Sequence, residues 1–129
     1  MFGKGLVRTL DTEIETLCRK AGKAANIQLR FEHSLAEFLV TLHDQAFDLA
    51  MFDFEDTATE HQTWVKLIRR IRPKLPLIVV CGRIDHLLGA RMHELGIFYL
   101  GCRPLHQRIM HEVFTAALRS SSGMPSAAS

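Results

Sequence analysis

Short apolar runs alternate along this chain with longer stretches in which apolar residues recur every three or four positions. The short runs predict β-strands over residues 5–8, 27–31, 49–52, 77–81 and 97–100. The periodic stretches predict amphipathic helices around residues 14–21, 35–42, 64–71, 84–95 and 110–117. Strands and helices that alternate in this way predict a parallel sheet with helices on both of its faces.

Polar residues and turn formers mark where these helices begin and end. Residues 12–15 and 34–37 each carry a hydroxyl and, three positions later, a carboxylate, which is the pattern of a capping box at a helix N-terminus. Pro73 ends the third helix, and Gly96 stands where a helix C-terminus favours a residue that tolerates positive φ. These signals therefore predict where a helix ends before the next strand begins.

Strand composition predicts the order of the sheet. Residues 49–52 and 77–80 are apolar throughout, as central strands covered on both faces must be, whereas residues 27–31 alternate in the manner of an edge strand. We therefore expect an α/β, flavodoxin-like, doubly wound sheet of five strands in the order 2-1-3-4-5. One domain over residues 1–119 accounts for the pattern, and residues 120–129, small and polar, are expected to be a disordered tail or a linker.

Composition and charge exclude several classes of protein. The chain is 47% hydrophobic and 23% charged, which is typical of a globular domain, and no apolar stretch approaches the length of a membrane span. Its net charge of +2 argues against a nucleic-acid binder. Three cysteines without a CxxC pair argue against a zinc site or a disulfide framework. The sequence thus predicts a cytoplasmic protein without a cofactor.

Polar side chains gather after the predicted strands. In parallel α/β sheets the functional crevice lies beyond the carboxyl ends of the strands, so these side chains are expected to meet there. The candidate pocket residues are Thr9, Leu10, Asp11, Asp53, Glu55, Cys81, Arg83, Arg103 and Pro104.

Several motifs in a fixed order resemble those of one family. They are Phe47-Asp-Leu-Ala-Met-Phe-Asp53, Ile68-Arg-Arg-Ile-Arg-Pro73, Leu75-Pro-Leu-Ile-Val-Val-Cys-Gly82, Glu94-Leu-Gly96 and Arg103-Pro104. Together they resemble a response-regulator receiver domain of the CheY-like kind, and the resemblance covers residues 4–119. This resemblance implies the same fold that the hydrophobic pattern predicts.

The resemblance also implies roles by position. Asp53 stands where the family has its phosphoacceptor, and Cys81 stands where it has a Ser or Thr that follows the phosphoryl group. Arg103 replaces a Lys that pairs with the phosphate, and Pro104 is expected to follow it through a cis peptide bond. Asp53 is therefore the phosphoacceptor-like residue of this chain.

The departures from the family pattern concern the metal site and the switch residue. Thr9 and Leu10 stand where the family has the acidic pair that holds Mg²⁺, and Asp11 replaces them only if the chain bulges. Leu100 stands at the switch aromatic position. Because phosphoryl transfer to an aspartate needs the metal to neutralise developing charge, these losses favour a pseudo-receiver, without enzymatic activity and without a phosphorylation cycle.

Two predictions concern the pairing of side chains near the crevice, one for a salt bridge and one against a redox pair. Asp53 is interpreted as a structural acid in a salt bridge with Arg103 or Arg83. Cys81 and Cys102 are interpreted as core residues and not as a redox pair, because an Arg103 side chain that points into the pocket turns Cys102 away.

The function predicted from these features is a phosphorylation-independent protein–protein interaction module in bacterial signal transduction. The expected contact face, the one that receivers use, comprises the fourth helix, fifth strand and fifth helix, and homodimerisation through it is a further hypothesis. Its candidate residues are Leu87, Leu88, Arg91, Tyr99, His106 and Met110. Tyr99 either contacts a partner or packs beneath the last helix. The alternatives are a phosphorylatable receiver with Asp53 as acceptor and Mg²⁺ as cofactor, and a redox or small-ligand sensor that uses the same crevice.

Overall fold

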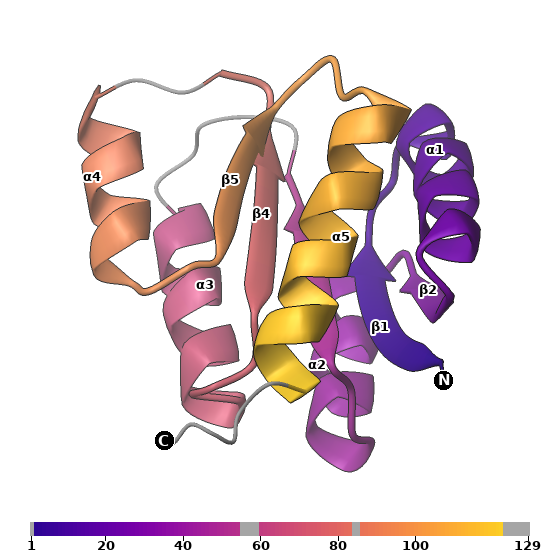
Figure 1. Ribbon diagram of the computed structural model, residues 1–129. Coiled ribbons are helices and arrows are strands. Elements are labelled where there is room, and N and C mark those ends of the chain that lie inside the picture. The colour runs from indigo at the N-terminus through magenta and orange to yellow at the C-terminus, as the bar shows by residue number, and fades with distance from the viewer. Residues whose placement is uncertain (1, 55–59, 84–85, 123–129) are drawn as a thin grey trace.

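Five parallel strands form the sheet at the centre of the molecule (Figure 1). The structure, a computed structural model, describes residues 2–54, 60–83 and 86–122. The strands are β1 (Gly3–Arg8), β2 (Ile27–Glu32), β3 (Leu49–Asp53), β4 (Leu77–Cys81) and β5 (Tyr99–Cys102). They lie side by side in the order β2-β1-β3-β4-β5, and every neighbouring pair is parallel. The predicted fold and strand order are confirmed.

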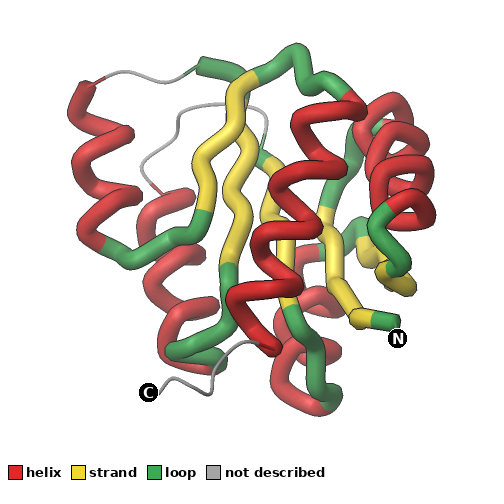
Figure 2. The backbone as a smooth tube through the Cα atoms, in the orientation of Figure 1, coloured by secondary structure: helices red, strands yellow, loops and turns green. Residues whose placement is uncertain are grey.

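Five helices cover the two faces of this sheet (Figure 2). They are α1 (Thr12–Ala24), α2 (Leu35–Asp44), α3 (Glu60–Ile71), α4 (His86–Glu94) and α5 (Gln107–Ser122). Apolar residues of α2, α3 and α4 pack in one cluster against the sheet, and those of α1 and α5 pack in the other. We call these faces the α2/α3/α4 face and the α1/α5 face.

The core alternates between these two faces along each central strand. All residues of β3 and β4 are buried, as their apolar composition predicts. On β4, Leu77, Val79 and Cys81 join the cluster on the α2/α3/α4 face. Ile78 and Val80 join the cluster on the α1/α5 face. A side chain's position along a strand therefore decides which helices it touches.

The first helix begins one residue earlier than its capping pattern predicts. The N-cap of α1 is Asp11, whose Oδ1 accepts hydrogen bonds from the backbone N–H of Glu13 (2.9 Å) and Ile14 (3.3 Å). Thr12 is already within the helix, so the predicted Thr12 cap is wrong. The cap of α2 is confirmed, because Ser34 accepts a hydrogen bond from the Glu37 N–H.

The last strand starts two positions after the apolar run that predicts it. Gly96 adopts a φ of 72°, as expected of the residue after a helix, and Ile97 and Phe98 then form the connection to β5. The strand itself runs on to Cys102, directly before Arg103. An apolar run predicts which residues are buried and not which residues pair their backbones in a sheet. The run therefore begins before the strand does.

The chain beyond residue 119 and the loops fit the predictions only in part. Helix α5 extends to Ser122, so the first residues of the predicted tail are helical.

Glu55 and Ile84 lie outside the described residues. The Arg103–Pro104 peptide bond is cis, as the resemblance implies. None of the described helices combines the length and hydropathy that crossing a bilayer requires.

Candidate functional site

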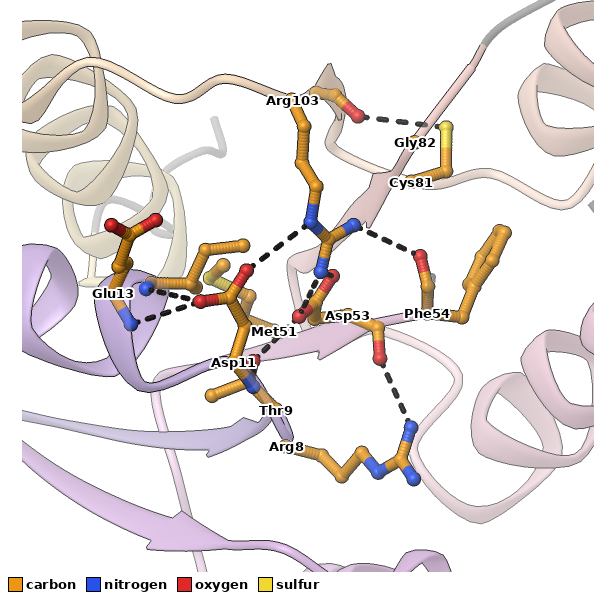
Figure 3. A network of polar contacts seen from close by, with 12 residues as sticks. Arg8, Thr9, Asp11, Glu13, Met51, Asp53, Phe54, Cys81, Gly82 and Arg103 are labelled. Atoms are coloured by element: carbon orange, nitrogen blue, oxygen red, sulfur yellow. Dashed lines mark hydrogen bonds and ion pairs between the residues drawn. The ribbon is translucent and has the colours of Figure 1, made fainter. Parts of the chain in front are cut away.

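A buried carboxylate lies at the carboxyl end of the sheet, where the crevice was predicted. Asp53, the last residue of β3, is 1% exposed. Thr9, which follows β1, is also buried, and its hydroxyl donates a hydrogen bond of 2.5 Å to Asp53 Oδ2 (Figure 3). The parallel alignment of β1 and β3 brings these two strand ends together. The structure therefore places a charged group where almost no water reaches it.

Arg103 supplies the opposite charge. Its Nη2 lies 2.5 Å from Asp53 Oδ1 and 2.6 Å from Oδ2, and its Nη1 donates to the Phe54 carbonyl at 3.2 Å. Its Nε lies 3.4 Å from Asp11 Oδ2. All three guanidinium nitrogens thus have acceptors (Figure 3). The predicted salt bridge of Asp53 forms with Arg103 and not with Arg83, whose side chain is exposed. We call the Thr9, Asp53 and Arg103 contacts the latch.

Asp11 has two roles in this arrangement. One oxygen caps α1, and the other faces Arg103. Burial by itself raises the pKa of Asp11, but the hydrogen bonds from the N–H groups of Ile14 and Glu13 and the nearby Arg103 hold that pKa below its usual value. Asp11 is therefore ionised and engaged at neutral pH.

The pKa of Asp53 moves in the other direction. Burial raises it, and the Thr9 hydroxyl and the Arg103 charge oppose that shift without cancelling it. The Asp11 carboxylate adds a small upward contribution. The ionised form of Asp53 thus depends on the latch for its stability.

Arg8 is the site residue that sequence reasoning missed. Its Nη1 donates to the backbone carbonyl of Asp53 at 3.0 Å, and its Nε donates to the His33 carbonyl at 3.1 Å. The guanidinium also lies over the Phe52 ring, 5.7 Å from its centre. A cation at the last position of an otherwise apolar strand is the signal that could have identified it, because such a residue faces the crevice.

The donor set that the structure describes at this site does not fit Mg²⁺. Leu10 offers no ligand and is 60% exposed, and the Thr9 hydroxyl is bonded to Asp53. Asp11 is committed to its helix and to Arg103, and Asp53 is neutralised by that same cation. Mg²⁺ prefers carboxylate oxygens that keep their charge for the metal. Within the described residues, no group of three metal-binding side chains comes together.

The two cysteines that end β4 and β5 lie on one face of the sheet. Cys81 and Cys102 are register partners on β4 and β5, and partners in parallel strands project to the same side. The prediction that Arg103 turns Cys102 away from Cys81 is therefore wrong. Cys81 is buried on the α2/α3/α4 face, whereas Cys102 is exposed. Burial, with a contribution from nearby Cys102, raises the pKa of Cys81 to about 11.

The predicted contact face is only partly exposed. Leu87 is 62% exposed, and Arg91 and His106 are exposed as well. Met110, however, is 0% exposed, and Leu88 is buried, so neither presents its side chain to a partner. Both belong to the core because they lie on the inner stripes of α5 and α4.

Tyr99 is half-buried and packs with the α1/α5 cluster, which agrees with the alternative that it lies beneath the last helix. Leu100, one position on, packs with the opposite cluster.

Pro104 is exposed beside a cavity of about 370 Å³ that Asp11 and Arg103 also line.

Comparison with known proteins shows the fold and nothing finer. No family model matches the chain, and no curated protein matches it in sequence. A CheY-like response regulator receiver domain protein from Methanospirillum hungatei JF-1 superposes with a TM-score of 0.82 at 18% identity, covering 95% of this chain and 98% of that one. An orphan response regulator of H. pylori gives 0.80 at 14% identity, covering 91% and 97%. The chemotaxis regulator CheY4 of Vibrio cholerae gives 0.77 at 13%, covering 92% and 100%.

Proposed function

We propose that this chain, which has the fold of CheY-like receiver domains, is a pseudo-receiver: a protein–protein interaction module that works without phosphorylation of Asp53. The observation that carries the proposal is the latch. Both carboxylate oxygens of Asp53 are bonded to Arg103, and one of them also accepts from Thr9.

Phosphoryl transfer to this carboxylate has two obstacles. The attacking oxygen must be accessible, yet Asp53 is 1% exposed and its oxygens already hold close hydrogen bonds. The developing negative charge must also be neutralised, which a divalent metal bound beside the acceptor would do. Among the residues around Asp53 that the structure describes, no carboxylate is left free for such a metal.

Arg103 gives the site a different use. Its guanidinium connects the end of β5 to the ends of β3 and β1 through charge-assisted hydrogen bonds. A receiver signals by switching between two arrangements of these loops, whereas an internal cation that satisfies the carboxylate favours one arrangement. We infer that the crevice is a structural element and that signalling specificity lies on the outer surface.

The surface that we propose for a partner comprises α4, β5 and α5. Its exposed apolar residues are Leu87 and Ile109, together with Phe98 before β5. Arg91 adds a charge, although it also donates to Gln62 at 3.0 Å. Apolar side chains beside a cation suit a protein partner or a second copy of this chain. Bacterial two-component signalling is the setting in which we place the module.

The test is titration with Mg²⁺ and beryllofluoride, observed through the amide NMR signals of Asp53 and Phe54. We expect no saturable shift in the wild-type chain, because the acceptor is already bonded to Arg103 and Thr9 and the described residues of the site leave no free carboxylate for the metal. The comparison variant combines Thr9→Asp with Arg103→Lys, which removes the latch and supplies a carboxylate. Saturable, metal-dependent shifts in the wild-type chain would refute the proposal and favour a phosphorylatable receiver.

A further inference from the structure

Two thiols meet at the carboxyl ends of β4 and β5. Cys81 is the last residue of β4 and Cys102 the last residue of β5, and the two are partners in the register of the sheet. The preceding partners show which side they face. Val79 and Leu100 both pack on the α2/α3/α4 face, and side chains two positions further along each strand return to that same face.

The spacing of the strands suits a covalent link. Neighbouring parallel strands lie about 4.7–4.9 Å apart, and disulfides form between Cα atoms roughly 4.4–6.8 Å apart. Both cysteines are terminal residues of their strands. The usual spacing of parallel strands therefore falls within the range over which disulfides form.

The hydrogen bonds of the two sulfurs place each one against the other's backbone. Cys102 Sγ donates to the carbonyl of Gly82, the residue after Cys81, at 3.2 Å. Cys81 Sγ lies 3.7 Å from the carbonyl of Gly101, the residue before Cys102, and 3.4 Å from that of Arg83. Each sulfur thus contacts a backbone carbonyl next to the other cysteine. These contacts are a second observation, separate from the strand register, and they agree with it.

We propose that Cys81 and Cys102 form an oxidisable dithiol site whose oxidant is a low-molecular-weight disulfide of the glutathione type. The site rests on the register and the sulfur contacts, and it does not depend on the pseudo-receiver function. In the reaction the two protein thiols become one disulfide, and the small disulfide takes up two electrons and two protons to become two small thiols.

The order of the two steps follows from exposure. Cys102 is exposed, so its thiolate attacks the small disulfide, releases one small thiol and forms a mixed disulfide. Cys81 then loses its proton and attacks the Cys102 sulfur, and the second small thiol leaves. Cys81 is fully buried and its pKa is raised to about 11, so the second step is the slower one and accelerates as the pH rises.

The experiment is incubation of the full chain with oxidised glutathione, followed by mass spectrometry without reduction. We expect a transient glutathione adduct and then a product that has lost two hydrogen atoms. Tryptic cleavage after Arg83 and Arg91 separates the two cysteines in sequence, so a linked peptide pair identifies the bond. Cys18 provides the matched control because it is fully buried in the other cluster.

Three variants complete the test. Cys18→Ser should form the disulfide as the wild type does, and Cys102→Ser should form neither the adduct nor the disulfide. Cys81→Ala should stop at the Cys102 adduct. A wild-type chain that accumulates a stable Cys102 adduct, or that links Cys102 to Cys18 or to a second chain, would overturn the proposal.

Discussion

Arg103 supplies the positive charge that compensates the buried negative charge of the site. Burying an ion pair gains little net stability, because desolvating the charges offsets most of their attraction. Removing one partner is costly, because the remaining charge stays buried without compensation. Removing either charge of the latch should therefore lower the free energy of unfolding.

The two charges of the latch should differ in the cost of their removal. Arg103→Gln leaves the Asp53 carboxylate, which is 1% exposed, without a cation, and we expect a loss of about 3 kcal/mol in the free energy of unfolding. Asp53→Asn leaves a guanidinium whose side chain is 21% exposed, so water compensates in part and the loss should be about 1–2 kcal/mol. Urea unfolding measures both.

A double variant supplies the control for this pair. The combined Asp53→Asn and Arg103→Gln chain should lose clearly less than the sum of the single losses, since neither charge is then left alone. Equal losses for the single variants, or additivity in the double, would contradict the assigned burial of the two charges.

Asp11 should make the stability depend on acidic pH. Its pKa in the folded chain is lower than in the unfolded chain, so its contribution is present above the unfolded value and is lost as the pH falls through the folded one. Asp11→Asn keeps an oxygen for the helix cap but carries no charge. We expect the variant to lose less stability than the wild type as the pH falls below the ordinary pKa of an aspartate and through the lower pKa of Asp11 in the folded chain.

The matched control for that experiment is Glu13→Gln. Glu13 is an exposed acid in the first turn of the same helix, so its replacement removes the same charge from the same helix end. Thermal unfolding across the acid range measures all three chains. If Asp11→Asn parallels the wild type throughout, Asp11 does not contribute through its ionisation.

Sequence reasoning located the charged residues of the site but not all of their contacts. The Asp53–Arg103 salt bridge was predictable, because opposite charges at the carboxyl ends of parallel strands in one sheet meet in the crevice. The relation between Cys81 and Cys102 was not, because it depends on the register of β4 with β5, which an apolar pattern does not determine. Arg8 was missed because it was assigned to a strand and not to the crevice.

At the scale of elements, the pattern of apolar residues predicted all ten of the helices and strands that the structure describes, and it failed at their ends. Helix α1 is capped by Asp11 and not by Thr12, because an aspartate caps a helix at least as well as a threonine. Strand β5 starts at Tyr99 because the chain must first leave α4 through Gly96. Local hydrogen bonds decide these boundaries, and hydrophobic periodicity does not report them.

The turn after α4 should respond to backbone conformation alone. Gly96 has a φ of 72°, and a Cβ built there meets no atom within 4 Å. Gly96→Ala should therefore cost about 1 kcal/mol of unfolding free energy through strain in the left-handed region. Gly96→Asn is the control, since asparagine tolerates that region better and should cost clearly less.

Chemical denaturation distinguishes the two variants of this turn. If Gly96→Ala is as stable as the wild type, the turn must relax to a negative φ without loss. Equal destabilisation by alanine and asparagine would instead indicate a side-chain clash, which the open surroundings of Gly96 do not predict.

At the scale of the whole molecule, the proposed contact surface is distinguished by its exposed apolar side chains. Leu87 on α4 and Ile109 on α5 belong to the proposed contact surface, while Val40 on α2 is comparably exposed but lies outside it. Single exposed apolar residues are normal on monomers. Substitutions at these positions can therefore be compared to test whether the α4–β5–α5 surface contributes to binding more than the surface of α2 does.

We expect Leu87→Asp combined with Ile109→Asp to weaken binding of a partner, or self-association, by at least about tenfold, as for central contact residues. Val40→Asp should leave binding unchanged. Sedimentation measures self-association, and the purified chain immobilised as bait measures partner binding. Circular dichroism first establishes that each variant is folded. Equal effects of the α2 and the α4/α5 substitutions would contradict the assignment of the contact surface.

The latch has a consequence for how this site can evolve. Replacement of Arg103 alone leaves a buried carboxylate unpaired, and replacement of Thr9 by an acid alone places a second carboxylate beside Asp53. Each single step towards a metal-binding, phosphorylatable site therefore passes through a less stable protein, although the complete set of changes need not. Selection acting on one substitution at a time would retain the present arrangement, so the phosphorylation-independent function that we propose is expected to persist in the descendants of this chain.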